Sequence, residues 1–258
     1  MREFIYGFLF SLVLFIVVGI IFYIFGKSLW YPYYEKLIIK KDVTPIKSHK
    51  CPEPKVIERN ITIIRDKDEN LTSKERLKIA LAKSDFIIYP NKLTLIALKY
   101  EKRLEVWGED SSGRYRKIST YPFTAFSGRL GPKLKEGDRQ IPEGIYGISY
   151  LNPNSKFHLS MRVTYPNSFD RKMAKREQRE SLGGDIMIHG SNQTIGCIPI
   201  GDSKIEELYF LAQKVGIDNI KVIISPVDFR KMEVKIKNHR HPWLKELYSN
   251  IKKEIKRY

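Results

Sequence analysis

The chain has 258 residues, 42% of them hydrophobic and 29% charged, which is the composition of a folded protein with one main domain and excludes a disordered chain. Its formal net charge of +17 favours anionic partners or a solvated basic surface, but no nucleic-acid-binding motif accompanies it and we expect no nucleic-acid partner. Two cysteines in all exclude a disulfide framework and a zinc ribbon.

An apolar run without a charged residue extends from Phe4 to Phe25. As a helix it would be about 33 Å long at about 1.5 Å per residue, which is enough to cross a bilayer. The run is long for a signal peptide, lacks a small-residue cleavage site and is followed by interfacial aromatic residues such as Trp30 and Tyr31. We therefore predict an uncleaved, single-pass transmembrane helix in residues 1–26.

Residues 27–85 are predicted to form a stalk that contains a short helix. Prolines recur in this segment and apolar periodicity is weak. The helix is expected to begin near Thr72, because Thr72 and Glu75 have the spacing of a capping box ahead of an apolar run. Cys51 lies in the polar part of the stalk and is interpreted as an incidental thiol.

Residues 86–226 are predicted to form the main domain, with an α+β, mostly β fold. Its first strand-like runs are separated by turn residues, which indicates an antiparallel meander. Residues 127–144 are rich in Gly and Pro and are expected to form a long irregular loop. The runs with a strand pattern are 92–100, 103–109, 115–126, 145–151 and 156–166.

The second half of this domain adds helices and a buried strand. Residues 171–180 are helix-forming but nearly all charged, which indicates a solvent-facing helix or a mobile flap. A helix is predicted at 203–215, with Ser203 and Glu206 as a capping box. Residues 219–226 read as a buried strand.

Residues 227–258 are predicted to form a basic C-terminal tail with an amphipathic helix. Such a helix either packs on its own domain or touches a membrane surface. Its apolar positions at helical spacing are Leu244, Leu247, Tyr248, Ile251 and Ile255.

The stretch from Ile186 to Asp202, "IMIHGSNQTIGCIPIGD", carries the residues with the most chemical potential. A nucleophilic cysteine needs a base within hydrogen-bond reach and donors for a developing oxyanion. His189 lies at the end of an apolar run, and Gly196 directly precedes Cys197, so a tight turn can expose the sulfur and direct backbone amides outward.

Two other interpretations of the same residues stay open at this point. Cys197 and His189 also suit a buried structural cysteine beside a hydrogen-bonded core histidine. A metal site would draw on Asp185, His158, His189 or Cys197, but their spacing matches no metal motif, and we expect no metal.

Two motifs together resemble the L,D-transpeptidase catalytic domain, also called the YkuD domain. "IHGSNQTIGCIPIGD" is similar to the active-site signature of that family, and "GPKLKEGDRQIPEGIYGI" to its upstream motif. The resemblance covers roughly residues 86–226 and is closest to the YafK-like branch, since "YPN" and Asp170 lie between the motifs. The chain departs from the larger clade at Ile195, Pro199 and Ile141, where that clade has other residues.

The resemblance implies a bent β-sandwich or barrel-like core with a few helices. It also implies that Cys197 is the nucleophile and His189 its base. Gly196, Gly190 and Thr194 would form or position the oxyanion site, and Thr194 suits a turn-capping role equally well. Arg162 and Tyr165 are weaker candidates for substrate binding.

In function, the resemblance implies a cysteine acyltransferase that makes L,D-cross-links between peptidoglycan stem peptides through a thioester, without a cofactor. A hydrolase of the same fold that trims stems or releases wall-linked proteins is the first alternative, and a non-catalytic wall-binding module is the second. Because peptidoglycan lies outside the cytoplasmic membrane, we expect the anchor in that membrane and the domain on its outer, periplasmic face.

Overall fold

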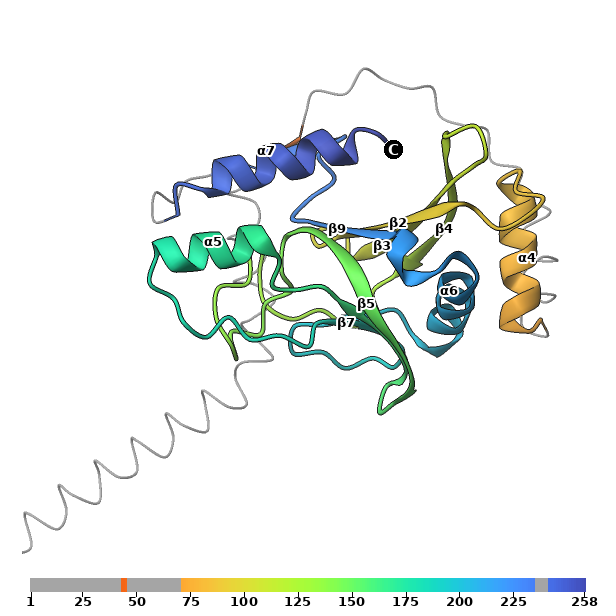
Figure 1. The fold of residues 1–258 in the computed structure, drawn as a ribbon, viewed down its shortest axis with the longest axis horizontal. Coiled ribbons are helices and arrows are strands. Elements are labelled where there is room, and N and C mark those ends of the chain that lie inside the picture. Colours follow the sequence, from red (N-terminus) through yellow and green to blue (C-terminus); the bar gives the residue numbers. More distant parts are fainter. Residues whose placement is uncertain (1–42, 46–70, 235–240) are drawn as a thin grey trace, which may run out of the picture.

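The computed structural model describes residues 43–45, 71–234 and 241–258 (Figure 1). The predicted membrane anchor and most of the predicted stalk lie outside these residues. Within them, no helix has the length and apolar character that a membrane span requires. The division into anchor, stalk, domain and tail stays a prediction.

The described elements combine one large sheet with four helices in the described ranges. In chain order they are β1 (Val43–Pro45), α4 (Ser73–Lys83), β2 (Lys92–Leu98), β3 (Arg103–Glu109), β4 (Tyr115–Pro122), β5 (Gly144–Ser155), β6 (His158–Val163), α5 (Ser168–Arg176), β7 (Met187–His189), β8 (Ile198–Pro199), α6 (Asp202–Val215), the 3-10 turn η1 (Ile217–Asn219), β9 (Ile220–Ser225), β10 (Met232–Val234) and α7 (Leu244–Ile255).

The large sheet has eight strands in the order β4-β3-β2-β9-β5-β6-β7-β8. The predicted meander is confirmed as the antiparallel set β2-β3-β4, and the predicted buried strand is β9, which lies parallel to β2 in the middle of the sheet. The strand β5 pairs with β9 through residues 144–147 and with β6 through later residues, so it joins the two halves of the sheet. The expected α+β, mostly β architecture is confirmed; among the described strands the order is open at β4 and β8 and does not close into a barrel.

The helices α4 and α6 pack together on one face of the sheet. The predicted cap of α4 is confirmed: the Thr72 hydroxyl accepts from the Glu75 amide, and the Glu75 carboxylate accepts from the Thr72 amide. The predicted capping box of α6 is wrong, because that helix begins at Asp202 after Gly201 and its N-cap makes no side-chain hydrogen bond. Instead, the Glu206 carboxylate is hydrogen-bonded to Ser73 of α4, so a contact between helices has replaced a local one.

The helix α7 covers the opposite face of the sheet (Figure 1). Ile96 of β2 and Ile223 of β9 pack against this helix. Their neighbours along each strand point to the opposite face and belong to the hydrophobic core beneath α4 and α6. The predicted amphipathic helix is therefore confirmed, and its apolar side is buried on its own domain. The charged segment after "YPN" forms α5, which is not wholly solvent-facing, since Met173 is buried in the core that α7 covers.

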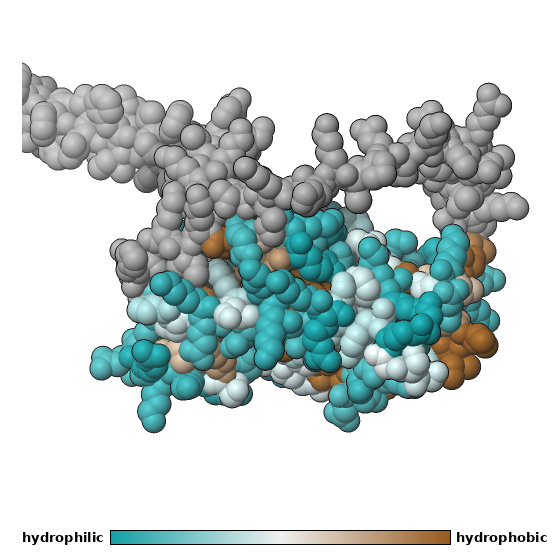
Figure 2. Space-filling view, turned by 90° about the horizontal axis from the view of Figure 1, so that it is seen from above, coloured by the Kyte–Doolittle hydropathy of each residue, from teal (hydrophilic) through white to brown (hydrophobic). Residues whose placement is uncertain are grey.

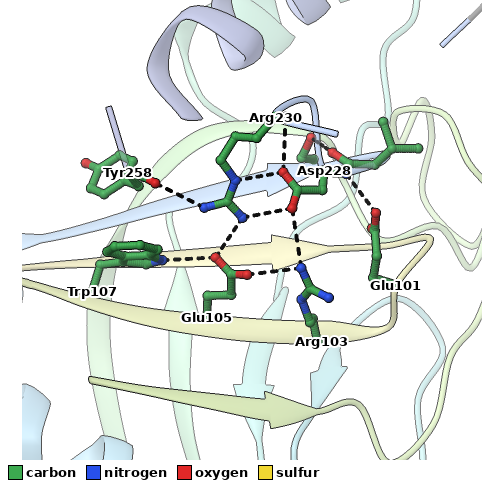
Figure 3. A network of polar contacts seen from close by, with 9 residues as sticks. Glu101, Arg103, Glu105, Trp107, Asp228, Arg230 and Tyr258 are labelled. Atoms are coloured by element: carbon green, nitrogen blue, oxygen red, sulfur yellow. Dashed lines mark hydrogen bonds and ion pairs between the residues drawn. The ribbon is translucent and has the colours of Figure 1, made fainter. Parts of the chain in front are cut away.

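A polar network fastens the end of the chain to the sheet (Figure 3). The Arg230 guanidinium donates to Asp228 at 2.7 Å and to Glu105 at 2.8 Å, and it also donates to the Tyr258 carbonyl at 3.4 Å. Arg103 pairs with the same two carboxylates. Because each carboxylate meets two guanidinium groups, the network contributes more to stability than an isolated surface ion pair.

The described side chains on the face shown in Figure 2 are mostly hydrophilic, in keeping with the high charge.

Candidate active site

The short strands β6, β7 and β8 bring the motif residues to one face of the sheet. Ser160 lies opposite His189, and Arg162 lies opposite Met187. Directly opposed residues share a face and successive residues alternate, so all four side chains belong to the same face. In the parallel pairing of β7 with β8, Ile188 lies opposite Ile198, and continuing this register by one residue gives Cys197 the face of Met187. The Met187 amide nitrogen lies 3.4 Å from the Cys197 Sγ, so the two residues are neighbours.

Cys197 is a free, half-buried thiol held by backbone groups. Its Sγ receives the Met187 N–H and donates to the Asp185 carbonyl at 3.6 Å. Burial raises the pKa of the Cys197 thiol above its usual value, and the Met187 hydrogen bond opposes this rise. The resting sulfur at neutral pH is therefore a thiol and not a preformed thiolate.

His189 is almost completely buried, with 1% of its surface exposed. Its Nδ1 lies 2.5 Å from the Gly190 carbonyl oxygen, which can only accept, so Nδ1 carries the proton and Nε2 has the free lone pair. The Phe157 ring lies 4.7 Å from the imidazole, centroid to centroid. Burial lowers the pKa of His189, so the imidazole is neutral at pH 7 and able to accept a proton at Nε2.

Gly190 is required by packing as well as by its carbonyl. A Cβ at this position would lie 2.5 Å from Asp202 Oδ1 and 2.8 Å from the Phe157 carbonyl oxygen. The same Asp202 oxygen accepts from the Ser191 amide at 2.6 Å. The turn after β7 is thus packed closely enough that only glycine fits beside the imidazole.

The turn before Cys197 is organised by Thr194. Its hydroxyl donates to the Cys197 carbonyl at 2.7 Å and accepts from the Gly196 amide at 3.2 Å. Gly196 adopts φ 135°, and a Cβ there would lie 3.1 Å from the Gln140 carbonyl oxygen. The structure therefore gives Thr194 a turn-capping role, and in this conformation the Gly196 amide is already engaged.

The two weaker candidates lie in different environments. The Arg162 side chain is 47% exposed on the face of the thiol and pairs with Asp185, Nη2 to Oδ1, at 2.8 Å. Tyr165 is buried, and its hydroxyl donates to the Leu182 carbonyl at 3.2 Å. The structure brings Arg162 to the site and places Tyr165 in the supporting core.

A buried ion pair supports the loop that faces the thiol, and the sequence patterns did not reveal it. Lys99 and Glu143 have fully buried side chains whose Nζ and Oε1 lie 2.9 Å apart. The Glu143 carboxylate also accepts from the Gly131 amide at 2.7 Å and from the Tyr248 hydroxyl of α7 at 2.8 Å. The only signal in the sequence was the Pro-Glu-Gly motif that contains Glu143. Within the described ranges, no group of three or more His, Cys, Asp or Glu side chains has an arrangement that could hold a metal ion.

Comparison with known proteins gives this arrangement a family. The model of the L,D-transpeptidase catalytic domain, YkuD, matches residues 95–224. The putative L,D-transpeptidase YafK of Escherichia coli (strain K12) is 27% identical over 157 residues, which are 60% of this chain and 61% of that protein. The chain thus spans less than two thirds of the length of this relative.

Two solved structures are also similar to this chain. The helical cell shape determining protein Pgp2 from Campylobacter jejuni is 23% identical, over 64% of this chain and 59% of that one, with a TM-score of 0.44. Bd1075 of Bdellovibrio bacteriovorus is 18% identical, over 66% of this chain and 55% of that one, with a TM-score of 0.39. Because the family model spans half of the sequence and includes both Cys197 and His189, the chain belongs to the L,D-transpeptidase catalytic domain (YkuD) family.

Proposed function

We propose that the chain is a membrane-anchored cysteine acyltransferase that acts on peptidoglycan stem peptides. The observation that carries the proposal is the hydrogen bond from His189 Nδ1 to the Gly190 carbonyl, which leaves Nε2 free as a base on the sheet face that also holds Cys197. Family membership supports the substrate class.

In the first half-reaction, His189 Nε2 takes the proton of the Cys197 thiol as the sulfur attacks the donor carbonyl, at the L-centre of the diamino acid. Backbone amides around Cys197 stabilise the tetrahedral oxyanion; because Thr194 engages the Gly196 amide, that donor becomes available only when the turn adjusts. The imidazolium then protonates the amine of the leaving D-alanine, and a thioester on Cys197 remains.

In the second half-reaction, an acceptor attacks the thioester. An amine from another stem or a wall-linked protein gives up a proton to His189, forms a new amide bond and releases the thiol. Water in the same position yields a carboxylic acid, which is the hydrolase alternative. Neither route needs a cofactor, because every proton moves between the acceptor, the imidazole and the sulfur.

The resting electrostatics suit this general-base route. The pKa of Cys197 is raised by burial and the pKa of His189 is lowered by burial, so both groups are neutral before substrate arrives. Because both groups are neutral, the site does not have to hold two buried charges before the reaction. Charge develops only during the reaction, when the preorganised backbone dipoles can stabilise it.

The proposal includes a location. Peptidoglycan lies outside the cytoplasmic membrane, so the anchor in residues 1–26 would hold the domain on the outer face. The net charge of +17 suits a domain that works close to an anionic polymer.

The test is mass spectrometry of purified muropeptides incubated with the full chain, beside a Cys197→Ala variant of the same chain. New cross-linked or amine-exchanged products that the variant does not form would establish a transpeptidase. Trimmed stems or released wall-linked protein without a new bond would identify water as the acceptor. Identical product patterns with wild type and variant would contradict the cysteine mechanism and favour a binding module.

A further inference from the structure

Arg162 and Asp185 form an ion pair at the edge of the candidate active site. Arg162 lies opposite Met187, whose amide is hydrogen-bonded to the Cys197 sulfur, and Asp185 offers its carbonyl to the same sulfur. Arg162 is therefore separated from Cys197 by the strand β7, and its side chain lies on the same face of the sheet as the thiol.

This ion pair is easily exchanged. The side chains of Arg162 and Asp185 are 47% and 77% exposed, and pairs in such a setting contribute about 0–1 kcal/mol. Asp185 follows Gly184, and a Cβ at Gly184 would meet no atom within 4 Å, so the space directly before Asp185 is open. Another carboxylate can take the place of Asp185 without disturbing the core.

Among the described residues near the thiol, Arg162 is also more available than Lys133. Lys133 is close enough to lower the pKa of Cys197, but it is buried, and its Nζ is committed to Asp138 at 2.7 Å and to the Lys135 carbonyl at 2.9 Å. Arg162 has a planar group that binds carboxylates with two parallel hydrogen bonds.

We propose that Arg162 binds a carboxylate of the acyl donor and that Asp185 is a placeholder, which the donor carboxylate displaces from the guanidinium. The ligand class is a peptide with a carboxylate close to the scissile bond, as in a stem that ends in a diamino acid and D-alanine. The inference rests on the proposed function in taking Cys197 as the nucleophile.

The Asp185 carboxylate also acts on the sulfur. Burial is the main cause of the raised pKa of Cys197, and the negative charge of Asp185 adds to this rise.

The first test needs no peptide substrate. Iodoacetate and iodoacetamide alkylate a thiolate by the same displacement of iodide and differ in carrying a carboxylate or a carboxamide. The ratio of their rate constants at Cys197, divided by the same ratio for free N-acetylcysteine, reports carboxylate recognition. A change in the pKa of the sulfur cancels from this ratio, because both reagents react with the same thiolate.

For the full-length protein, we expect Arg162→Ala to lower the ratio at least about tenfold, as the loss of a charge-assisted hydrogen bond requires. Arg162→Lys should restore part of it, and Asp185→Asn should raise it above wild type. The matched control is Arg116→Ala, which breaks an ion pair with Asp85 whose side chain is also 77% exposed, away from the thiol. It should leave the ratio unchanged.

A ratio in Arg162→Ala within twofold of wild type would overturn carboxylate binding, and an unchanged ratio in Asp185→Asn would overturn the placeholder. The second test compares kcat/KM for a stem tetrapeptide with that for two variants of the peptide, in each of which a different carboxylate is replaced by a carboxamide. One amide should react about tenfold less well with wild type but not with Arg162→Ala, and equal rates for all three peptides would contradict the subsite. Failure of every peptide to react would count against the proposed function, and the alkylation ratio would still decide the subsite.

Discussion

Burial raises the pKa of the Cys197 thiol and the hydrogen bond from Met187 lowers it, and the effect of burial is the larger. The sequence predicts a base for this thiol in His189, which lies eight residues before Cys197 in the chain. The structure shows that this histidine is itself buried and that burial lowers its pKa, so it stabilises no thiolate by charge in the resting state. In the proposed mechanism, reactivity at Cys197 therefore depends on proton transfer to His189 during the reaction.

We predict that the rate of alkylation of Cys197 by iodoacetamide rises with pH through an inflection above about 8.5, the usual thiol pKa. The pKa is raised in the folded protein, so the thiolate fraction at pH 7 is smaller than in a free cysteine. Peptide mapping by mass spectrometry separates Cys197 from Cys51. Asp185→Asn should move the inflection to lower pH, and an inflection below 8.5 in wild type would contradict the burial argument.

Gly190 gives a second prediction for a single residue. Gly190→Ala places a Cβ against Asp202 and the Phe157 backbone, and we expect it to lower the free energy of unfolding by about 2 kcal/mol or more and to reduce activity. Gly184→Ala is the control, because its Cβ would meet open space, and it should change stability by less than about 0.5 kcal/mol. Thermal and urea unfolding measure both variants; equal stabilities would refute the packing argument.

At the scale of elements, the C-terminal helix α7 supports the loop beside the candidate active site. Its Tyr248 hydroxyl donates to Glu143, and Glu143 and its partner Lys99 hold the loop of residues 127–143. Lys99 also donates to the carbonyls of Gly131 and Ile141 within that loop. The loop carries Gln140, whose carbonyl faces Gly196, so a helix outside the family match contributes to the position of the turn before Cys197.

We therefore expect Tyr248→Phe to lower the free energy of unfolding by about 1–3 kcal/mol, since a buried carboxylate loses a donor, and to lower kcat/KM as well. Tyr258→Phe removes a phenol hydroxyl that is hydrogen-bonded to Thr94 at 2.8 Å, away from the loop. This control should cost about 1 kcal/mol and leave kcat/KM unchanged. Equal effects of both variants on activity would mean that α7 serves stability alone.

On the scale of the whole molecule, the eight-stranded sheet is covered on both faces, and the candidate site lies at its β6-β7-β8 end. The family match ends before α7, yet α7 covers the hydrophobic core on the face of the sheet opposite α4 and α6. The proposed anchor would tether this body through the predicted stalk, and the high positive charge would keep it near an anionic wall.

This arrangement predicts the topology of the full chain. A reporter that is active only outside the cytoplasm, fused after Tyr258, should be active, and the fusion should fractionate with membranes. Deleting residues 1–26 should abolish both properties, because the proposed anchor is then lost. Activity of a cytoplasmic reporter at the same position would contradict the location and, with it, the proposed substrate.

Sequence by itself was sufficient for features that depend on neighbours along the chain. The capping box at Thr72, the strand-and-turn pattern of the β2-β3-β4 meander and the amphipathic pattern of α7 are set by residues a few positions apart, and each was predicted. Cys197 and His189 were singled out in the same way, by the glycines and apolar runs around them. Tertiary structure alone decided the parallel pairing of β2 with β9, the exchange of the Glu206 cap for contacts with Ser73 and His158, the buried Lys99–Glu143 pair and the position of Arg162 beside Asp185. These contacts join residues far apart in the chain or depend on which polar group finds a partner once water is excluded, and no local pattern encodes that choice.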